Sequence, residues 1–283
     1  MLSFFRKKKS VAQKTFTNKP NYTCTAVALT DVGEIRKNNE DKIVFVQPHN
    51  QKVLSQKGSL AIVCDGMGGH KSGEVASKIA IQRVQKYYYS SNSNPKEAIK
   101  EALSYAHKEI KKVSLKNANH SKMGTTCTAV TVIGRSLYIG HAGDSRAYLI
   151  SNNIIKQLTK DHTYVEHLYN KGLITEQEKL RHPDRNIVTM VLGTQSEFIP
   201  EVYSYENVFS NDEILMLCSD GLYEYIGDNE IMNILTENEA SSAAEILVET
   251  AKKRGGHDNI SVIIVRNQKK TESLKPQITK QIN

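Results

Sequence analysis

The chain has 283 residues, 39% of them hydrophobic and 24% charged, which is typical of a soluble globular enzyme with one large domain or two small ones. Its formal net charge of +8 lies at the two ends, because residues 1–20 carry +6 and residues 267–283 carry +3, which leaves −1 for residues 21–266. A nearly neutral body excludes a fold that binds nucleic acid through a broad basic surface.

A basic arm over residues 1–21 opens the chain. Residues 1–5 are followed directly by the cations at 6–9, so the apolar core of a secretory signal is missing, and no later stretch approaches the roughly 18 apolar residues of a membrane span. We therefore expect a cytoplasmic protein. The arm allows at most a weak, reversible membrane contact, at about 1 kcal/mol per cation, and a solvated arm is the simpler interpretation.

The first strands are predicted at residues 22–29 and 43–46, separated by a turn and a charged loop. The polar stretch 47–58 predicts a further loop. Residues 59–64 then form an apolar, β-branched run that stops at Asp65.

Three glycines follow Asp65 within four residues, so the run indicates a buried strand that brings a carboxylate to a tight turn. Taken alone, Asp65 is better explained as a turn former. A phosphate-binding loop fits badly, because Asp65 and His70 stand where that motif requires glycines.

Two helices are predicted next. Residues 73–88 place apolar side chains at helical spacing, and a second helix is marked by Asn94 as N-cap, Pro95 at its first position and Glu97 at its third. Successive short strand-like runs then predict an antiparallel meander, over residues 125–133, 137–140, 147–150 and 154–158.

Residues 159–188 are polar and predict an excursion from the sheet with two short helices, one opened by Thr175 and Glu178, and a stop at Pro183. The rest of the chain predicts strands at 188–192, 201–209, 213–218 and 260–265, helices at 228–236 and 241–254, and a loose polar tail over 267–283. Because strands and helices are segregated rather than alternating, the pattern favours an α+β fold in which helices cover both faces of antiparallel sheets.

The four cysteines stand singly inside strand-like runs, at Cys24, Cys64, Cys127 and Cys218. Without a close pair they indicate neither a zinc knuckle nor a redox motif, and we expect buried thiols in a reducing compartment. Cys64 adjoins Asp65, which makes it a candidate for oxidation, although an inert buried thiol explains it as well.

Acidic residues recur at strand boundaries beside glycine, asparagine or serine, at Asp41, Asp65, Asp144, Asp220 and Asp258. If the strands share sheets, these carboxylates converge, and their repulsion predicts a bound cation. Oxygen ligands without cysteine or paired histidines suit Mg²⁺ or Mn²⁺ rather than Zn²⁺. Independent turn acids are the alternative interpretation.

Two such ions about 3.5 to 4 Å apart orient a water for in-line attack on phosphorus. Arg36 is the natural phosphate clamp, since a guanidinium offers a planar fork of donors. The predicted chemistry is therefore phosphoester hydrolysis by water.

Five ordered motifs resemble those of the metal-dependent protein phosphatase family, type 2C, in its bacterial form, and the match covers residues 22–266. The motifs are Thr30-Asp31-Val32-Gly33 with Arg36 and Asn39-Glu40-Asp41, and the segments 64–70, 140–146, 218–222 and 256–259. The resemblance implies a four-layer α-β-β-α sandwich of two antiparallel sheets flanked by helices, and it makes residues 159–188 a flap beside the active site. It also implies a dinuclear Mn²⁺ or Mg²⁺ site and phosphorylated proteins as substrates.

The resemblance further assigns roles to individual residues. Asp65 would bridge both ions, the Gly66 carbonyl and Glu40 (through water) would serve one ion, and Asp220 with Asp258 the other. Asp41 would hold metal-bound waters. Asp144 with Asp220 matches a third, weaker metal position, and its alternative is a turn acid paired to Arg146.

Met67 departs from the animal relatives, which have a histidine there that is proposed to protonate the leaving group. Methionine cannot do so, and we expect a metal-bound water or another group to act, with His162 as a candidate. His70, His141 and His257 are expected to be structural.

The sequence therefore predicts a monomeric serine/threonine protein phosphatase that opposes a bacterial serine/threonine kinase and binds no nucleic acid. The alternative is a non-catalytic regulator of the same fold that binds phosphoproteins without turning them over, for which Met67 is the only indication.

Overall fold

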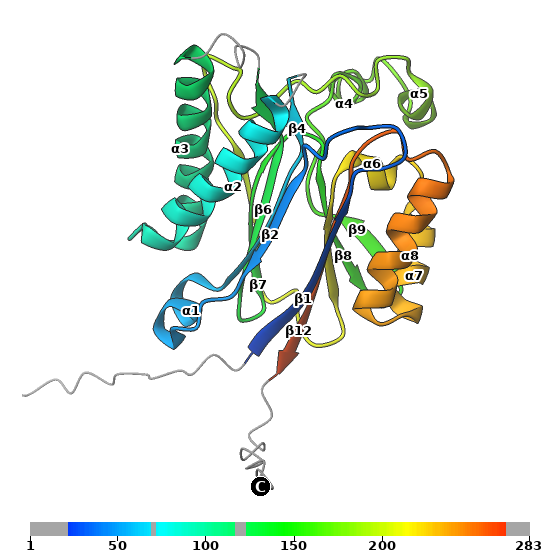
Figure 1. Ribbon diagram of the computed structural model, residues 1–283. Helices are drawn as coiled ribbons and strands as arrows, with labels where there is room; N and C mark the ends of the chain where they lie inside the picture. The colour runs from blue at the N-terminus through cyan, green and yellow to red at the C-terminus, as the bar shows by residue number, and fades with distance from the viewer. Residues whose placement is uncertain (1–21, 69–71, 117–122, 270–283) are drawn as a thin grey trace, which may run out of the picture.

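The computed structural model describes residues 22–68, 72–116 and 123–269. Within them the chain forms two stacked five-stranded antiparallel sheets with helices packed on both outer faces (Figure 1). This confirms the predicted four-layer α+β sandwich. No helix of the described residues is long and apolar enough to span a membrane. The basic arm and most of the predicted tail lie outside the described residues.

The first sheet contains both ends of the described chain and has the order β1-β12-β11-β8-β9. Tyr22 pairs with Lys269 and Asp31 with Ile260, so the outer pair is antiparallel along its whole length. Two helices, α7 and α8, cover the sheet. The bounds are β1 Tyr22–Asp31, β8 Arg146–Ser151, β9 Ile154–Gln157, β11 Ile214–Cys218, β12 Ile260–Lys269, α7 Asp228–Glu237 and α8 Ala240–Lys253.

The second sheet has the order β10-β7-β6-β3-β2 and is covered by the long helices α2 and α3. A two-stranded ribbon, β4 with β5, extends from its end. The bounds are β2 Lys42–Val46, β3 Ser59–Cys64, β4 Gly66–Met67, β5 Gly124–Thr125, β6 Cys127–Ile133, β7 Ser136–Ala142, β10 Glu201–Tyr205, α2 Ser72–Ser90 and α3 Pro95–Lys116.

Along the central strands, successive side chains point to opposite faces of the sheet. They therefore fill the core between the two sheets and the core between each sheet and its helices. In β3, Leu60 and Ile62 pack under α2 and α3, whereas Ala61 and Val63 face the other sheet. Because both faces of β3 are covered, all six of its residues are buried, as the continuous apolar run predicted. The strand is therefore a fixed support for Asp65 at its end.

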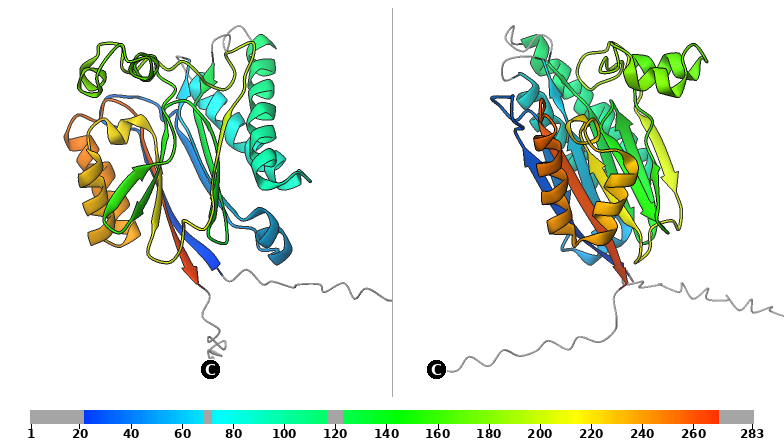
Figure 2. Two further views of the ribbon diagram at one scale, coloured as in Figure 1. Left: turned by 180° about the vertical axis from the view of Figure 1, so that it is seen from behind. Right: turned by 90° about the vertical axis from the view of Figure 1, so that its right-hand side faces the viewer.

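Two shorter helices, α4 Tyr164–Asn170 and α5 Glu176–Arg181, occupy the flap. Both lie at the end of the sandwich opposite Tyr22 and Lys269 (Figures 1 and 2). The capping box of Thr175 and Glu178 is present as predicted, and Asn94 Oδ1 accepts the Glu97 N–H at 3.0 Å at the start of α3.

Residues 47–58 were expected to form a loop, but they contain the helix α1, Gln51–Lys57. Asn50 supplies its N-cap, since the side-chain oxygen accepts the N–H groups of Lys52 and Val53. Because the segment is largely polar, its composition indicated a loop and the N-cap at Asn50 was not recognised. A second unpredicted helix, α6, covers Asp220–Tyr223.

The predicted meander over residues 125–158 is wrong, because its two hairpins belong to different sheets. β6 pairs with β7 in the second sheet, and β8 pairs with β9 in the first. The chain crosses between sheets at Gly143, where φ is +113° and a Cβ would lie 2.5 Å from Thr126 Cβ.

Three further strand predictions require correction. β10 ends at Tyr205, short of the predicted end at 209. Residues 188–192 form only isolated bridges, Thr163 with Val188 and Thr125 with Leu192. β12 continues to Lys269, beyond the predicted end at 265, because Asn267 is buried and its amide donates to the carbonyls of Gly134 and Phe209.

Candidate active site

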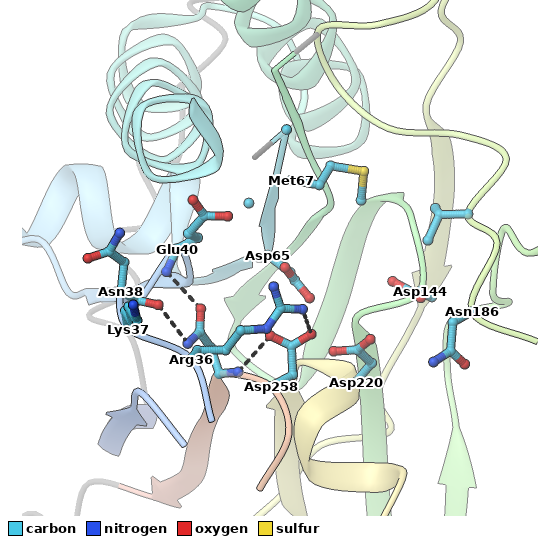
Figure 3. Close-up of a pocket in the computed structure, with 14 residues that line it drawn as sticks. Arg36, Lys37, Asn38, Glu40, Asp65, Met67, Asp144, Asn186, Asp220 and Asp258 are labelled. Atoms are coloured by element: carbon cyan, nitrogen blue, oxygen red, sulfur yellow. Dashed lines mark hydrogen bonds and ion pairs between the residues drawn. The ribbon is translucent and has the colours of Figure 1, made fainter. Parts of the chain in front are cut away.

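Acids from distant parts of the sequence gather at the end of the sandwich that carries the flap. A cleft of about 450 Å³ opens there, and Figure 3 shows the carboxylates of Asp65, Asp220 and Asp258 around one space, with Met67 beside it. The predicted residues that line the cleft are Arg36, Glu40, Asp65, Gly66, Asp144, Asp220 and Asp258. The convergence expected from the sequence is confirmed, whereas the role of each residue remains a prediction.

Asp65 is held by its backbone on the neighbouring strand. Its N–H donates to Thr126 Oγ1 at 2.9 Å, and its carbonyl accepts the Thr126 N–H and the Thr125 hydroxyl, both at 2.8 Å. These bonds leave the carboxylate free to point into the cleft. The sequence pattern assigns no role to Thr126, since a threonine at the start of a strand is unremarkable.

Asp41 lies beneath the cleft rather than in its lining and is 1% exposed. Its Oδ2 accepts the hydroxyls of Ser219 at 2.8 Å and Ser261 at 2.6 Å. Burial raises its pKa to about 6, although the two serines lower it in part. Oδ1 is buried without a hydrogen-bond partner among the described residues.

Asn259 joins the loop that carries Glu40 to the loop before β12. Its Oδ1 accepts the Glu40 N–H at 2.7 Å, and its Nδ2 donates to the carbonyls of Val32 at 2.9 Å and Asn38 at 3.0 Å. The two loops touch at Gly33, where φ is +77° and a Cβ would lie 2.2 Å from the Asp258 carbonyl oxygen. The sequence pattern gives Asn259 no role beyond its place in a motif, because its partners lie more than 200 residues away.

Arg36 reaches across the cleft, and its Nη2 lies 2.6 Å from Asp258 Oδ2. The side chain is 53% exposed, so it is accessible to a ligand. The nearby acids Asp258, Asp65 and Glu40 raise its pKa and outweigh the opposing effect of burial. The geometry places an accessible planar cation in the lining of the acidic cleft.

Asp144 follows β7 and is 4% exposed. Burial and then the charge of Asp161 raise its pKa to about 7. The expected pair of Asp144 with Arg146 does not form, because the Arg146 guanidinium binds Asp161, with Nη2 to Oδ2 at 2.6 Å, and lies over the Tyr223 ring at 3.6 Å.

The electrostatics of the cleft favour bound cations. Burial and the charges of neighbouring acids raise the pKa of Asp65 and Asp220 well above the ordinary carboxyl value, and burial raises that of Glu40. Asp220 Oδ1 is buried with no hydrogen-bond partner in the described part of the chain. These are oxygen donors that a hard divalent ion would satisfy, so the residues fit Mn²⁺ or Mg²⁺.

As the side chains stand, no three acidic, histidine or cysteine residues of the described segments form a ready-made ion site. Asp258 Oδ2 contacts Arg36 instead. The donor set nevertheless suits a cation, since clustered carboxylates are relieved either by protonation or by a bound cation.

The histidines lie away from the cleft lining where the structure describes them. His162 Nδ1 accepts the Gly143 N–H at 3.1 Å, and the side chain is only 9% exposed, so the structure does not bring this candidate proton donor to the cleft. His141 bonds Thr128 and the Lys160 carbonyl, and His257 bonds Tyr225, as expected of structural residues. His70 lies outside the described residues.

All four cysteines are buried and free, as predicted. Burial raises the pKa of the Cys64 thiol well above its ordinary value, so it is held as an unreactive thiol.

Comparison with known proteins agrees with this arrangement. The family model described as Protein phosphatase 2C matches residues 25–167. The serine/threonine phosphatase stp of Listeria monocytogenes is 33% identical over 243 residues, which cover 83% of this chain and 93% of the relative. Among solved structures, serine/threonine phosphatase Stp1 from Staphylococcus aureus has a TM-score of 0.78 at 33% identity, covering 86% of this chain and 95% of that chain.

The catalytic domain of the serine/threonine protein phosphatase PstP was solved in complex with two manganese ions. It has a TM-score of 0.75 at 29% identity and covers 87% of this chain and 99% of that chain. Sequence, fold and the gathered acids lead to one assignment: the chain belongs to the protein phosphatase 2C family.

Proposed function

We propose that this member of the family hydrolyses phosphoserine and phosphothreonine in proteins, with two Mn²⁺ or Mg²⁺ ions held in the acidic cleft. Asp65 would bridge the ions, with Glu40 and the Gly66 carbonyl on one side and Asp220 and Asp258 on the other. Asp41 would hold metal-bound waters. Asp144 and Asp220 would offer a third, weaker position.

The observation that carries the proposal is that Asp65, Asp144 and Asp220 share one cleft and form no ion pair with a cationic side chain of the described residues. Bound there, divalent ions would supply the Lewis acidity that lowers the pKa of water and takes up charge on phosphoryl oxygens. The chain's own part is to orient the substrate, and Arg36 can bind two phosphoryl oxygens through its planar guanidinium. Met67 borders the cleft but has no proton to donate.

Hydrolysis of a small aryl phosphate tests the proposal. We expect turnover with Mn²⁺ or Mg²⁺, loss of turnover in excess chelator, and a fall in kcat of at least about 100-fold in Asp220→Asn. Asp212→Asn is the matched control, because Asp212 is exposed and lies outside the cleft. Activity that survives chelation or the Asp220 change would remove the proposal.

The finer biological assignment is also part of the proposal. We place the enzyme in the cytoplasm as a monomer that opposes a serine/threonine kinase, and its buried free thiols support a reducing compartment. Phosphoproteomes of cells with and without the gene would identify substrates and kinase. A chain that binds phosphopeptides tightly but never turns them over would instead be the non-catalytic regulator.

A further inference from the structure

A second cleft of about 380 Å³ lies between the flap and α6 and adjoins the acidic cleft. Asp144 and Asn186 line both clefts, so they are continuous. Figure 1 shows α4 and α5 at the same end of the molecule as α6. A peptide whose phosphoresidue occupies the acidic cleft would therefore place its neighbouring side chains here.

Most charges along this second cleft are neutralised internally. Arg146 binds Asp161 through two hydrogen bonds from Nε and one from Nη2, and Lys179 Nζ lies 2.8 Å from Glu166 Oε2. These four side chains form the walls and offer no free charge to a ligand.

Besides Asp144, two lining side chains carry charges without an ion pair in the described part of the chain. Glu224 follows α6, and Arg185 belongs to the flap. Asp144 lies at the inner end of this cleft, where it also lines the acidic cleft and is assigned to the proposed metal site. Glu224 is therefore the carboxylate of this cleft that remains available to a cationic side chain of a peptide, and Arg185 is the cation that opposes it.

The rest of the lining combines the polar residues Thr163, Asn186 and His257 with apolar and aromatic side chains. Leu180 lines the cleft although it is 69% exposed, and Val165 and Tyr225 lie along the same cleft. Apolar walls with an acid beside them suit a lysine or arginine side chain, whose aliphatic stem packs on carbon while its charged head reaches a carboxylate.

From this arrangement we propose that the cleft between the flap and α6 is a specificity subsite that takes a lysine or arginine flanking the phosphoresidue, with Glu224 as the residue that recognises its charge. The inference rests on the proposed phosphatase function. It assigns Glu224 to substrate selection, not to hydrolysis.

The test compares phosphopeptides that differ at one position, with arginine, alanine or glutamate placed at each of three positions on either side of a phosphothreonine. An extended peptide advances about 3.3 to 3.6 Å per residue, so this scan reaches about 10 Å in each direction. For the wild-type enzyme with saturating Mn²⁺, we expect kcat/KM to favour arginine over glutamate roughly fivefold at one position or more.

Three variants isolate the acid. Glu224→Gln should abolish the preference for arginine, and Glu224→Lys should reverse it toward glutamate. Arg185→Gln should sharpen the preference, because it removes the opposing cation. Glu245→Lys in α8 is the matched control, since Glu245 is exposed and lines neither cleft, and it should leave the preference intact.

Hydrolysis of a small aryl phosphate distinguishes a failure of the phosphatase proposal from a failure of the subsite proposal. Such a substrate fills only the acidic cleft, so the Glu224 variants should hydrolyse it as the wild type does. If the wild type does not hydrolyse it, the phosphatase proposal fails. If it does, the subsite is refuted by a wild type without a preference for arginine, by a preference for glutamate, or by Glu224 variants that lose activity equally on aryl phosphate and peptides, as variants of a metal ligand would.

Discussion

Replacing Asp144 by asparagine should stabilise the metal-free protein at alkaline pH. Asp144 is 4% exposed, and burial followed by the charge of Asp161 raises its pKa from 3.8 to about 7. A shift of about three pKa units corresponds to about 4 kcal/mol, at 1.36 kcal/mol per unit, for holding the carboxylate ionised in the fold. Asparagine has similar shape and carries no such charge.

The sign of the pH dependence follows from proton linkage. Because the folded pKa is higher than the unfolded one, the native state binds more protons than the unfolded state between about pH 4 and pH 7. The free energy of unfolding of the wild type therefore falls as pH rises through this window. The variant lacks this loss, so the two proteins should be nearly equal at pH 4, and the variant should be more stable by about 2 to 4 kcal/mol at pH 8.

Thermal denaturation in excess chelator at pH 5 and pH 8 measures the difference. Circular dichroism is the suitable probe because the chain has no tryptophan. At pH 8 the variant should melt at least about 5 °C higher, whereas Asp212→Asn should match the wild type. Adding Mn²⁺ should stabilise the wild type more than the variant. A variant that keeps the wild-type pH slope, or melts lower at pH 8, would show that Asp144 is not an uncompensated acid.

Three further substitutions test how the cleft is assembled and used. Asn259→Ala should lower the free energy of unfolding by about 3 kcal/mol in urea denaturation, because three hydrogen bonds are lost, and an equally stable variant would contradict the proposed link between loops. Arg36→Ala should raise KM for aryl phosphate about tenfold with little change in kcat, and an unchanged KM would remove its role as phosphate clamp. Gly66→Ala should cost about 1 to 3 kcal/mol and weaken Mn²⁺ binding in calorimetry, since a Cβ would lie 2.2 Å from the Gly73 carbonyl oxygen; wild-type affinity and stability would show that the contact relaxes freely.

The elements with strong local signals were predictable from sequence. The run at 59–64 is largely apolar because both faces of β3 are covered. The cap at Asn94 marks the start of α3, because its side chain accepts the N–H of Glu97, three residues later. In both cases the residues that specify the element are its own neighbours.

Elements decided by distant contacts were not predictable in the same way. A hairpin pattern is identical whether the next strand joins the same sheet or the other one, and at Gly143 close packing against Thr126 accompanies the change of sheet. Similarly, 188–192 has the composition of a strand, but each of its bridges pairs with a different segment. Register and sheet membership are tertiary properties, which local propensity does not contain.

The candidate site shows the same division. The acids themselves stand out because carboxylates at strand ends beside glycines are unusual in number and order. The residues that hold them do not, because Ser219, Ser261 and Thr126 are ordinary at strand ends, and the partners of Ser219 and Ser261 in the Asp41 network lie 178 and 220 residues away. Their role follows only from the fold.

Those serines also explain why the cleft depends on the intact sandwich. Asp41 precedes β2 in the second sheet, whereas Ser219 follows β11 and Ser261 lies on β12 in the first, so their hydrogen bonds tie the two sheets together beneath the cleft. The cleft is divided likewise, with Asp65 at the end of a second-sheet strand and Asp220 and Asp258 beside first-sheet strands. Any change that parts the sheets at this end therefore separates the acids and frees Asp41 to be solvated. Neither sheet alone contains the site. Repulsion among the acids opposes the packing of the two sheets at this end. A bound divalent ion would remove that repulsion and would therefore stabilise the packing.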